Sequence, residues 1–257
     1  MEVTEYDHGV PSWVDASVPD LPGARAFYGA LFGWDVPEGP PEAGGYSIAS
    51  LRGKPVAGIG PQMNPDFPPA WMTYVNVDDA DAVAAAVAAA GGQMLVPPMD
   101  VMDVGRLGIL ADPAGAVLGI WQPRAHKGAL IVNEPDTYCW SELVTTDLPG
   151  SAAFYGAVFG WGTKEVGEGP AYVEWQLSGR SVGGMLPKPA EMPAEVPPHW
   201  GVYFAVDDAD RVVRRIGELG GTVVMGPTDI EPGRFAVAVD PAGAVFNVLA
   251  LKAELGG

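Results

Sequence analysis

Two short stretches place an acidic side chain two residues after a tryptophan: Trp13 and Asp15 in the first half, Trp140 and Glu142 in the second. Each stretch alternates well enough for a strand, and side chains two apart on a strand share a face. A carboxylate beside indoles is desolvated, which raises its pKa and makes it a candidate general acid or base. The alternative is an ordinary hydrogen-bonded residue at a sheet edge. We expect Glu142, with its longer reach, to be the stronger candidate.

Other residues on or beside predicted strands are candidates to line a ligand cavity. His199 ends a proline-rich loop and is a candidate proton shuttle, with a solvated loop histidine as the alternative. Aromatic residues would stack on a flat, apolar ligand, although packing against helices is the alternative for each tryptophan and tyrosine. Besides Trp13 and Trp140, the aromatic candidates are Tyr46, Trp71, Trp121, Trp175, Trp200 and Tyr203.

The elements that must position these residues are written twice in the chain. The segment Asp20–Trp34 recurs as Asp147–Trp161, with twelve of fifteen positions identical. In each copy an acidic residue can cap a helix, and apolar residues follow at three- and four-residue spacing. A glycine then stands where a left-handed helix cap is wanted. The chain is therefore a fused duplicate, and each copy holds a short amphipathic helix laid on a sheet.

Each half also contains two units of the same plan. The first unit is a strand, the helix after Asp20, and strand-like runs at 34–36, 46–51 and 55–59; a second unit follows over 71–121. The sequence predicts an α+β fold of four βαβββ modules that form two curved mixed sheets around clefts. A unit with one helix on one sheet face leaves the other face open, so we expect function on the helix-free face.

Proline-containing polar segments divide the chain into domains, and the net charge excludes several classes of partner. We expect a first domain over 1–125, a linker over 126–136 and a second domain over 137–257. Lys and Arg total 14 against 32 Asp and Glu, a formal charge of −18, so nucleic acid and anionic membranes are poor partners.

The chain has one cysteine, which leaves no internal disulfide and fits a reducing compartment. We see no signal peptide and no stretch of membrane-spanning length, and expect a cytoplasmic protein. Because the duplication already gives a pseudo-dimer, we expect a monomer or a weak homodimer.

Three motifs resemble a known family. They are the helix ending Phe27–Trp34, with its Phe-Tyr-x-x-x-Phe-Gly-Trp pattern, the segment Val77–Asp81, and the Asp-Pro-x-Gly turn at Asp112, each repeated in the second half. They resemble the vicinal oxygen chelate superfamily of glyoxalases, bleomycin-resistance proteins and extradiol dioxygenases. The whole chain looks like the two-domain, actinobacterial glyoxalase-like branch that is often labelled hydroxylase. The resemblance implies tandem glyoxalase-like domains and does not specify the reaction.

The resemblance also places metal ligands on the first and last strands of each module. None of the residues at those positions is a histidine or an acid, and no histidine of the chain falls on them, so we expect neither a metal nor another cofactor. Asn247 could instead hydrogen-bond a carbonyl or phenol, while its counterpart Gly119 leaves the first cleft bare. The residues at the ligand positions are Trp13, Gly58, Met72 and Gly119 in the first half, and Trp140, Gly184, Gly201 and Asn247 in the second.

Three functions are open on these residues. The first is a metal-independent tailoring enzyme that uses acid–base chemistry on a flat aromatic or polycyclic metabolite such as an aromatic polyketide, in a dehydration, cyclisation or oxygenation. The second is a non-catalytic protein of the bleomycin-resistance type, which sequesters a small aromatic ligand. The third is glyoxalase-type lyase chemistry on small dicarbonyls.

Overall fold

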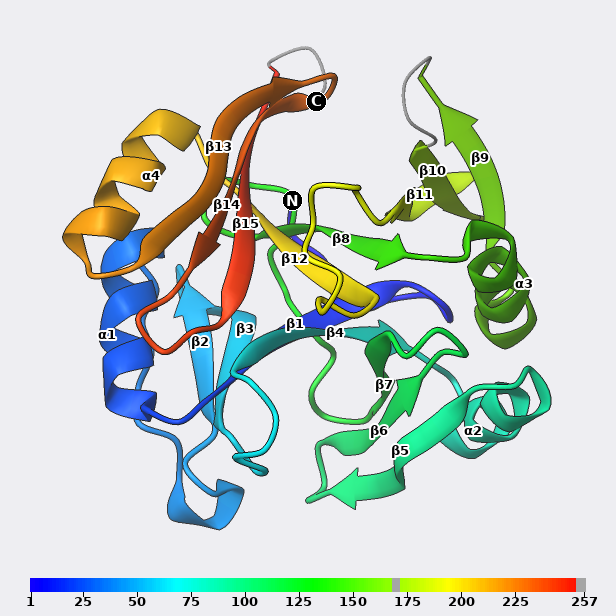
Figure 1. Cartoon of the computed structure of the whole chain (residues 1–257). Helices are drawn as coiled ribbons and strands as arrows, with labels where there is room; N and C mark the ends of the chain where they lie inside the picture. Colours follow the sequence, from blue (N-terminus) through cyan, green and yellow to red (C-terminus); the bar gives the residue numbers. More distant parts are fainter. Residues whose placement is uncertain (168–171, 253–257) are drawn as a thin grey trace.

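A computed structural model describes residues 1–167 and 172–252. The first half folds into a mixed sheet with the spatial order β2-β3-β1-β4-β7-β6-β5 (Figure 1). Its helices are α1 (Leu21–Phe32) and α2 (Ala80–Ala89), with a single 3-10 turn at Pro41–Ala43. The strands are β1 (Pro11–Val18), β2 (Ser47–Leu51), β3 (Lys54–Pro61), β4 (Ala70–Asn76), β5 (Gln93–Val101), β6 (Gly105–Ala111) and β7 (Val117–Pro123).

The second half folds into an eight-stranded mixed sheet with the order β13-β14-β15-β12-β8-β11-β10-β9. Its helices are α3 (Leu148–Phe159) and α4 (Ala209–Glu218). The strands are β8 (Tyr138–Thr145), β9 (Gly162–Val166), β10 (Tyr172–Leu177), β11 (Arg180–Pro187), β12 (His199–Ala205), β13 (Thr222–Ile230), β14 (Gly233–Val239) and β15 (Val245–Leu251).

The predicted α+β architecture of four modules in two mixed sheets is confirmed. In each sheet two modules join through their first strands, which run antiparallel: β1 beside β4, and β8 beside β12. The strand expected at 34–36 is wrong, because only Asp35 pairs there, in an isolated bridge to Ser50. The Trp34 indole turns inward and donates to the carbonyl of Asp136 at 2.7 Å, and prolines follow that cannot donate to a ladder.

The duplicated helices begin and end where the sequence indicates. The side chains of Asp20 and Asp147 each accept a hydrogen bond at 3.0 Å from the backbone N–H three residues on, which satisfies a free donor of the first turn. Gly33 and Gly160 close the helices with φ of 69° and 73°, a left-handed conformation that favours glycine.

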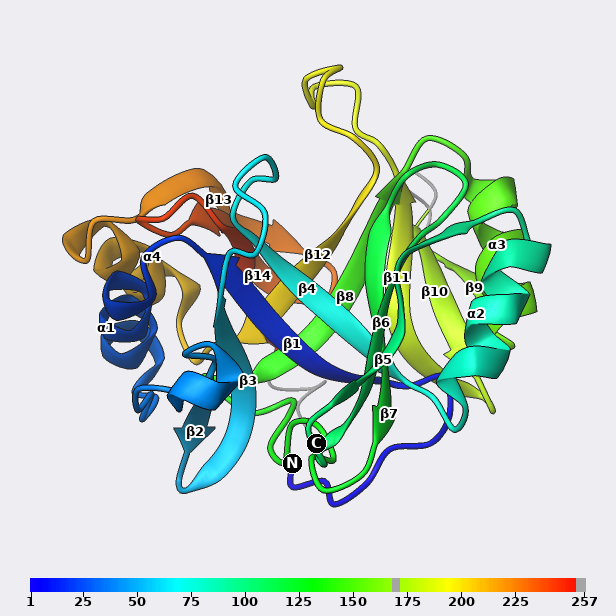
Figure 2. The same ribbon diagram turned by 90° about the horizontal axis from the view of Figure 1, so that it is seen from below.

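The two halves pack through the helix-covered faces of their sheets. Helix α1 lies beside α4 and helix α2 beside α3, on opposite sides of the molecule (Figures 1 and 2). One hydrophobic cluster joins the first module to the fourth, and a second cluster joins the second module to the third. Each core is therefore shared between the two halves.

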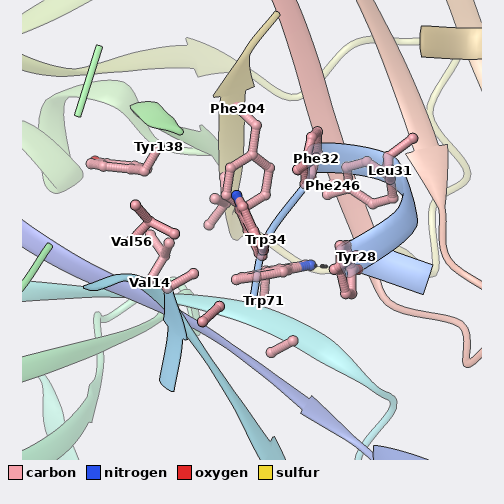
Figure 3. Packing of buried hydrophobic residues seen from close by; sticks show 14 of the residues in the cluster. Val14, Tyr28, Leu31, Phe32, Trp34, Val56, Trp71, Tyr138, Phe204 and Phe246 are labelled. Carbon is pink, nitrogen blue, oxygen red and sulfur yellow. Dashed lines mark hydrogen bonds between the residues drawn. The ribbon is translucent and has the colours of Figure 1, made fainter. Parts of the chain in front are cut away.

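A hydrogen-bonded chain crosses the first shared core. Trp71 Nε1 donates to Tyr28 Oη at 2.8 Å (Figure 3). Tyr28 Oη in turn donates to Asp240 Oδ2 at 2.8 Å. Phe204 and Phe246 of the second half pack around these rings. The tyrosine of the repeated helix motif thus meets the aspartate of the other half's Asp-Pro-Ala-Gly turn.

The second shared core repeats this chain. Trp200 Nε1 donates to Tyr155 Oη at 2.8 Å, and Tyr155 Oη donates to Asp112 Oδ2 at 3.1 Å. Both aspartates are buried, so truncating either would leave a phenol without its partner. These repeated motifs hold the halves together and leave the opposite sheet faces for function.

Candidate functional site

The open face of the first sheet carries a hydrogen-bonded network around Asp15. On β1, Val14 and Ala16 point into the shared core, so Trp13 and Asp15 point to the opposite face. Trp13 Nε1 donates to Tyr46 Oη at 2.9 Å, and Tyr46 Oη donates to Asp15 Oδ2 at 2.9 Å. The phenol of Tyr74 on β4, which stands opposite Trp13, faces the same carboxyl group and acts to lower its pKa. We call this set the first carboxylate network.

The second sheet repeats the arrangement around Glu142. Trp140 Nε1 donates to Tyr172 Oη at 2.9 Å, and Tyr203 Oη donates to Glu142 Oε1 at 2.7 Å. The Tyr172 phenol also faces the Glu142 carboxyl group and acts to lower its pKa. An indole, two phenols and a carboxylate therefore form the second carboxylate network, and each member lies at the position that corresponds to its counterpart in the first.

Both carboxyl groups are easier to protonate than exposed ones. Burial raises the pKa of Asp15 to about 6, and hydrogen bonds from Tyr46 and Tyr74 partly oppose the rise. Burial likewise raises the pKa of Glu142, against hydrogen bonds from Tyr203 and Tyr172. A carboxyl group whose pKa approaches neutrality can both accept and release protons, as general acid–base catalysis requires.

The phenols around these carboxyl groups stay protonated. Burial, followed by the charge of the neighbouring carboxylate, raises the pKa of Tyr46 and Tyr203 well above the ordinary tyrosine value. Burial also raises the pKa of Tyr74 and Tyr172. At neutral pH all four phenols are therefore protonated, and Tyr46 and Tyr203 donate to the carboxylates.

Glycines let the tyrosines lie across the sheet. A Cβ at Gly58 would stand 1.9 Å from Tyr46 Oη, and a Cβ at Gly184 would stand 2.0 Å from Tyr172 Oη. A Cβ at Gly119 would stand 2.2 Å from the Tyr74 ring. These three positions are glycine because an aromatic side chain occupies the volume above each of them.

The first cleft is covered at its Trp13 end by the segment after β7. The His126 ring packs edge-on against Trp13 with ring centres 4.4 Å apart, and against Trp121 at 5.5 Å. Trp121 Nε1 donates to the His126 carbonyl at 2.9 Å, which fixes this segment. Trp13 is only 4% exposed, and burial lowers the pKa of His126 to about 4, so the covering ring is neutral at pH 7.

The second cleft has more polar surroundings and a less covered tryptophan. Trp140 is partly exposed where Trp13 is buried, whereas Glu142 and Tyr172 are partly exposed like their counterparts Asp15 and Tyr46. Asn247 stands beside Tyr203 in the strand pairing and donates to the Val202 carbonyl at 3.1 Å. The residue that corresponds to Asn247 in the first sheet is a glycine. The second cleft therefore offers an additional amide next to its carboxylate.

His199 lies on the same sheet face as Glu142. It begins β12 opposite Val144, and Gly201 two residues on stands opposite Glu142. Its Nδ1 lies 2.9 Å from the Pro197 carbonyl, and its side chain is partly exposed. The structure thus places this histidine at the strand end, two residues along β12 from Gly201, which stands opposite Glu142.

Three of the tryptophans expected along a cavity lie on the helix-covered side instead. Trp71 and Trp200 are 5% and 7% exposed and donate to the tyrosines of the shared cores, as described above. Trp175 is fully buried and packs against Tyr155 and Trp161. Strand alternation separates all three from the carboxylates, so we no longer include them among ligand-binding residues.

The remaining residues expected at a site fall into two groups. Trp13, Tyr46, Met72 and Trp121 belong to the first cleft, and Trp140, Tyr203 and Asn247 to the second. From the sequence, Tyr74 and Tyr172 are phenolic donors in similar places that we did not include among the candidate site residues. Their signal was their matched positions in the two halves, Tyr74 with Tyr203 and Tyr46 with Tyr172.

One cavity lies away from both networks. It has a volume of about 610 Å³ and lies between the two halves, where Pro113, Asp147 and Phe154 contribute to its walls. No member of a carboxylate network lines it. We place the candidate chemistry at the carboxylates because the titratable groups with raised pKa gather there.

Comparison with known proteins identifies the family. The Glyoxalase/Bleomycin resistance protein/Dioxygenase superfamily model matches residues 11–120 and 137–248. The chain is 44% identical over 255 residues to CFP32 of Mycobacterium tuberculosis, a protein provisionally named a glyoxylase, with 96% of each chain covered. It is 36% identical over 266 residues to the anthracycline biosynthesis protein DnrV of Streptomyces peucetius, covering 97% of this chain and 96% of DnrV.

Solved structures extend the comparison of the fold. The Mn(II)-bound glyoxalase from Novosphingobium aromaticivorans superposes with a TM-score of 0.67 at 19% identity, covering 96% of this chain and 84% of that one. At this identity the likeness shows the fold alone. It also raises the question of whether this chain could hold a similar ion.

The residues present do not fit a divalent ion on the open faces. Among residues 1–167 and 172–252, no three His, Cys, Asp or Glu side chains gather as a metal centre would require. At Gly58 and Gly184, where the resemblance places a glutamate, a tyrosine hydroxyl fills the space that even a Cβ would need. Trp13 and Trp140 direct their indole N–H groups to those hydroxyls and have no free donor atom for a metal.

Proposed function

We propose, from the premise that this chain belongs to the Glyoxalase/Bleomycin resistance protein/Dioxygenase superfamily, that it is a metal-independent tailoring enzyme. It transfers protons on a flat aromatic or polycyclic metabolite. Glu142 in the second cleft is the proton-transferring group, and Tyr203 and Tyr172 orient it. The observation that carries the proposal is the second carboxylate network, which stands where superfamily relatives place a metal.

The network suits a group that must both take and give a proton. With a raised pKa, Glu142 can remove a proton from an acidic C–H or O–H of the ligand and return one to a departing hydroxyl or to a ketone oxygen. Two phenol donors hold the carboxylate in one orientation and stabilise its charged form. Dehydration and ring closure of an aromatic precursor are both reactions of this kind.

The ligand class rests on the walls of the cleft and on a relative. Trp140 and Tyr172 are partly exposed beside Glu142, and Phe235 is partly exposed further along the same sheet. Aromatic side chains of this kind stack on flat ligands. DnrV is an anthracycline biosynthesis protein, which supports a tailoring role on a polycyclic aromatic compound.

His199 and Asp15 receive different roles in this proposal. His199, partly exposed at the strand end, passes protons between solvent and the second cleft. Asp15 stabilises the first cleft, because His126 covers the neighbouring Trp13 and Met72 stands opposite the carboxylate. Glu142 is therefore the carboxylate on which turnover depends.

A matched pair of substitutions tests the proposal. Purified protein is incubated with a panel of hydroxylated polycyclic aromatic ketones, and products are identified by mass spectrometry. Glu142→Gln should lower the rate at least about 100-fold, the effect of losing a general acid or base. Asp15→Asn should stay within about threefold, because it is the corresponding change in the covered cleft.

Two results would overturn the proposal in favour of another function. Tight stoichiometric binding with every ligand recovered unaltered would indicate a sequestration protein of the bleomycin-resistance type. Turnover of the glutathione hemithioacetal of methylglyoxal, with the aromatic panel untouched, would indicate a glyoxalase, the activity that the name of CFP32 suggests.

A further inference from the structure

One position differs sharply between the two carboxylate networks. On β4, Met72 stands directly opposite Asp15, and its side chain packs against the hydrophobic cluster that includes Trp13 and Trp121. On β12, the corresponding residue opposite Glu142 is Gly201. The first carboxylate therefore has a thioether side chain beside it, whereas the second has no side chain at that place.

Backbone geometry does not require a glycine at Gly201. It is not among the glycines with positive φ, so an L side chain could adopt its conformation. The glycines under Tyr46, Tyr74 and Tyr172 are needed because a Cβ there would approach an aromatic side chain to 2.2 Å or less. The three atoms nearest to a Cβ at Gly201 would be Asn247 Nδ2 at 3.1 Å and two further atoms at 3.8 Å, so a small shift of the Asn247 amide would admit a side chain there.

The groups around Gly201 are polar and belong to the network. The Glu142 carboxyl lies on the opposing strand, and the Tyr203 phenol is two residues along β12. Asn247 stands beside Tyr203 on β15, where its amide N–H already serves the Val202 carbonyl. An amide has one carbonyl oxygen and two N–H donors, so Asn247 retains hydrogen-bonding capacity toward a ligand.

We propose that Gly201 is the floor of a subsite that receives the oxygen-bearing edge of a flat aromatic ligand, a phenol or ketone oxygen beside the ring. The inference rests on the proposed function and adds where the ligand sits. The missing side chain leaves room for the ring edge over β12. Glu142 and Asn247 contact the ligand oxygen, and Trp140 and Tyr172 stand along the ring. Because Met72 and His126 occupy the corresponding space in the first cleft, the chain binds one ligand.

Binding of quinizarin, a neutral dihydroxyanthraquinone, tests the subsite without any turnover. Its affinity and stoichiometry are measured by quenching of tryptophan fluorescence and by equilibrium dialysis on the full chain. We expect one site per chain. Gly201→Met should weaken binding at least about 30-fold by filling the floor, and Gly201→Ala about three- to tenfold.

Gly217 supplies the matched control. It lies in helix α4, has no positive φ, and a Cβ there would meet no atom within 4 Å. Gly217→Met introduces the same side chain without filling a cleft and should leave the affinity within about twofold. Thermal unfolding of each variant shows whether the fold is retained, and Gly201→Ala remains informative if Gly201→Met does not fold.

The outcomes separate the subsite from the proposed function. Unchanged quinizarin affinity in folded Gly201→Ala and Gly201→Met protein would overturn the subsite and leave the role of Glu142 standing. Weakened binding in these variants, with turnover unaffected in Glu142→Gln, would support the subsite while rejecting acid–base catalysis. A stoichiometry of two ligands per chain, or no binding by the unaltered protein, would also overturn the inference.

Discussion

In the first cleft Met72 stands opposite Asp15 and His126 packs on Trp13, whereas in the second Gly201 stands opposite Glu142 and Trp140 is partly exposed. The bond from indole to phenol is the same in both, at 2.9 Å, whereas the carboxylate accepts its bond from Tyr46 in the first cleft and from Tyr203, which corresponds to Tyr74, in the second. Similar sets of polar groups therefore lie in two different surroundings. The hydrogen bonds alone do not distinguish the clefts, and the proposed reaction site differs from the first cleft in the side chains next to its carboxylate.

Duplication explains how both surroundings can coexist. A carboxyl group buried against a sheet costs free energy when it ionises. Proteins often keep such a group where a function uses its raised pKa. In the first cleft the phenols satisfy Asp15 and the neighbouring apolar groups complete the packing. In the second cleft the same phenols leave one side of Glu142 next to Gly201. The following predictions test this difference, from the largest expected effect to the smallest.

The first prediction concerns the stability that the protein loses when Asp15 ionises as the pH rises toward neutrality. Its pKa is about 6 in the folded protein and near 3.8 when unfolded, so between these values the folded state binds more protons. The free energy of unfolding should therefore fall as pH rises from 4 to 6, by at most about 3 kcal/mol from this group. Asp15→Asn should remove that fall in urea unfolding measured at several pH values. Parallel curves for the variant and the unaltered protein would contradict a raised pKa of Asp15.

The second prediction compares the corresponding phenols Tyr203 and Tyr74. Tyr203→Phe removes a hydrogen bond to the charged Glu142 and should lower kcat about 10- to 30-fold. Since that bond lowers the pKa of Glu142, its loss should move the ionisation in the pH–rate profile to higher pH. Tyr74→Phe should change kcat by less than about threefold, because it alters the covered network. Equal losses in both variants would mean that the two clefts contribute alike.

Most of the architecture follows from local signals in the sequence. Asp20 and Gly33 mark the ends of a helix by capping chemistry that needs no tertiary context, and their repetition at Asp147 and Gly160 shows the duplication. The strand expected at 34–36 failed because the Trp34 indole is held by the Asp136 carbonyl, about a hundred residues away in the chain. Local propensity cannot represent such a contact.

The candidate site was predictable only in part. Alternation correctly put Trp13 with Asp15, and Trp140 with Glu142, on one face each. It could not show that Trp71, Trp175 and Trp200 point into the shared cores, because the two halves pack against each other in an arrangement the sequence does not display.

The glycines show a second limit of the sequence. Gly58 and Gly184 could be recognised as lacking a metal ligand, but not as lying under Tyr46 and Tyr172. The residues of each network come from separate strands, and their proximity depends on strand order and register.

A third prediction opens the first cleft. His126→Ala removes two edge-on aromatic contacts and should lower the free energy of unfolding by about 1 to 2 kcal/mol. Because burial is what raises the pKa of Asp15, the fall in stability between pH 4 and 6 should become shallower. Urea unfolding across this pH range measures both effects. Adding Met72→Gly should then create a second quinizarin site, and a stoichiometry that stays at one would show that other residues close this cleft.

The smallest effect is expected from a substitution that removes the Asn247 amide, which the first cleft lacks. Asn247→Gly places at β15 the residue that the first sheet has at Gly119, and removes the amide beside Tyr203 while leaving Glu142 and Gly201 in place. Losing one neutral hydrogen bond should weaken quinizarin binding about threefold, measured by tryptophan quenching. Asn247→Asp keeps the size and the acceptor but adds a charge, and distinguishes an amide donor from simple packing. If the Asn247→Gly variant binds quinizarin as tightly as the unaltered protein, Glu142 alone contacts the ligand oxygen. The clefts then differ in ligand binding only through the space over Gly201.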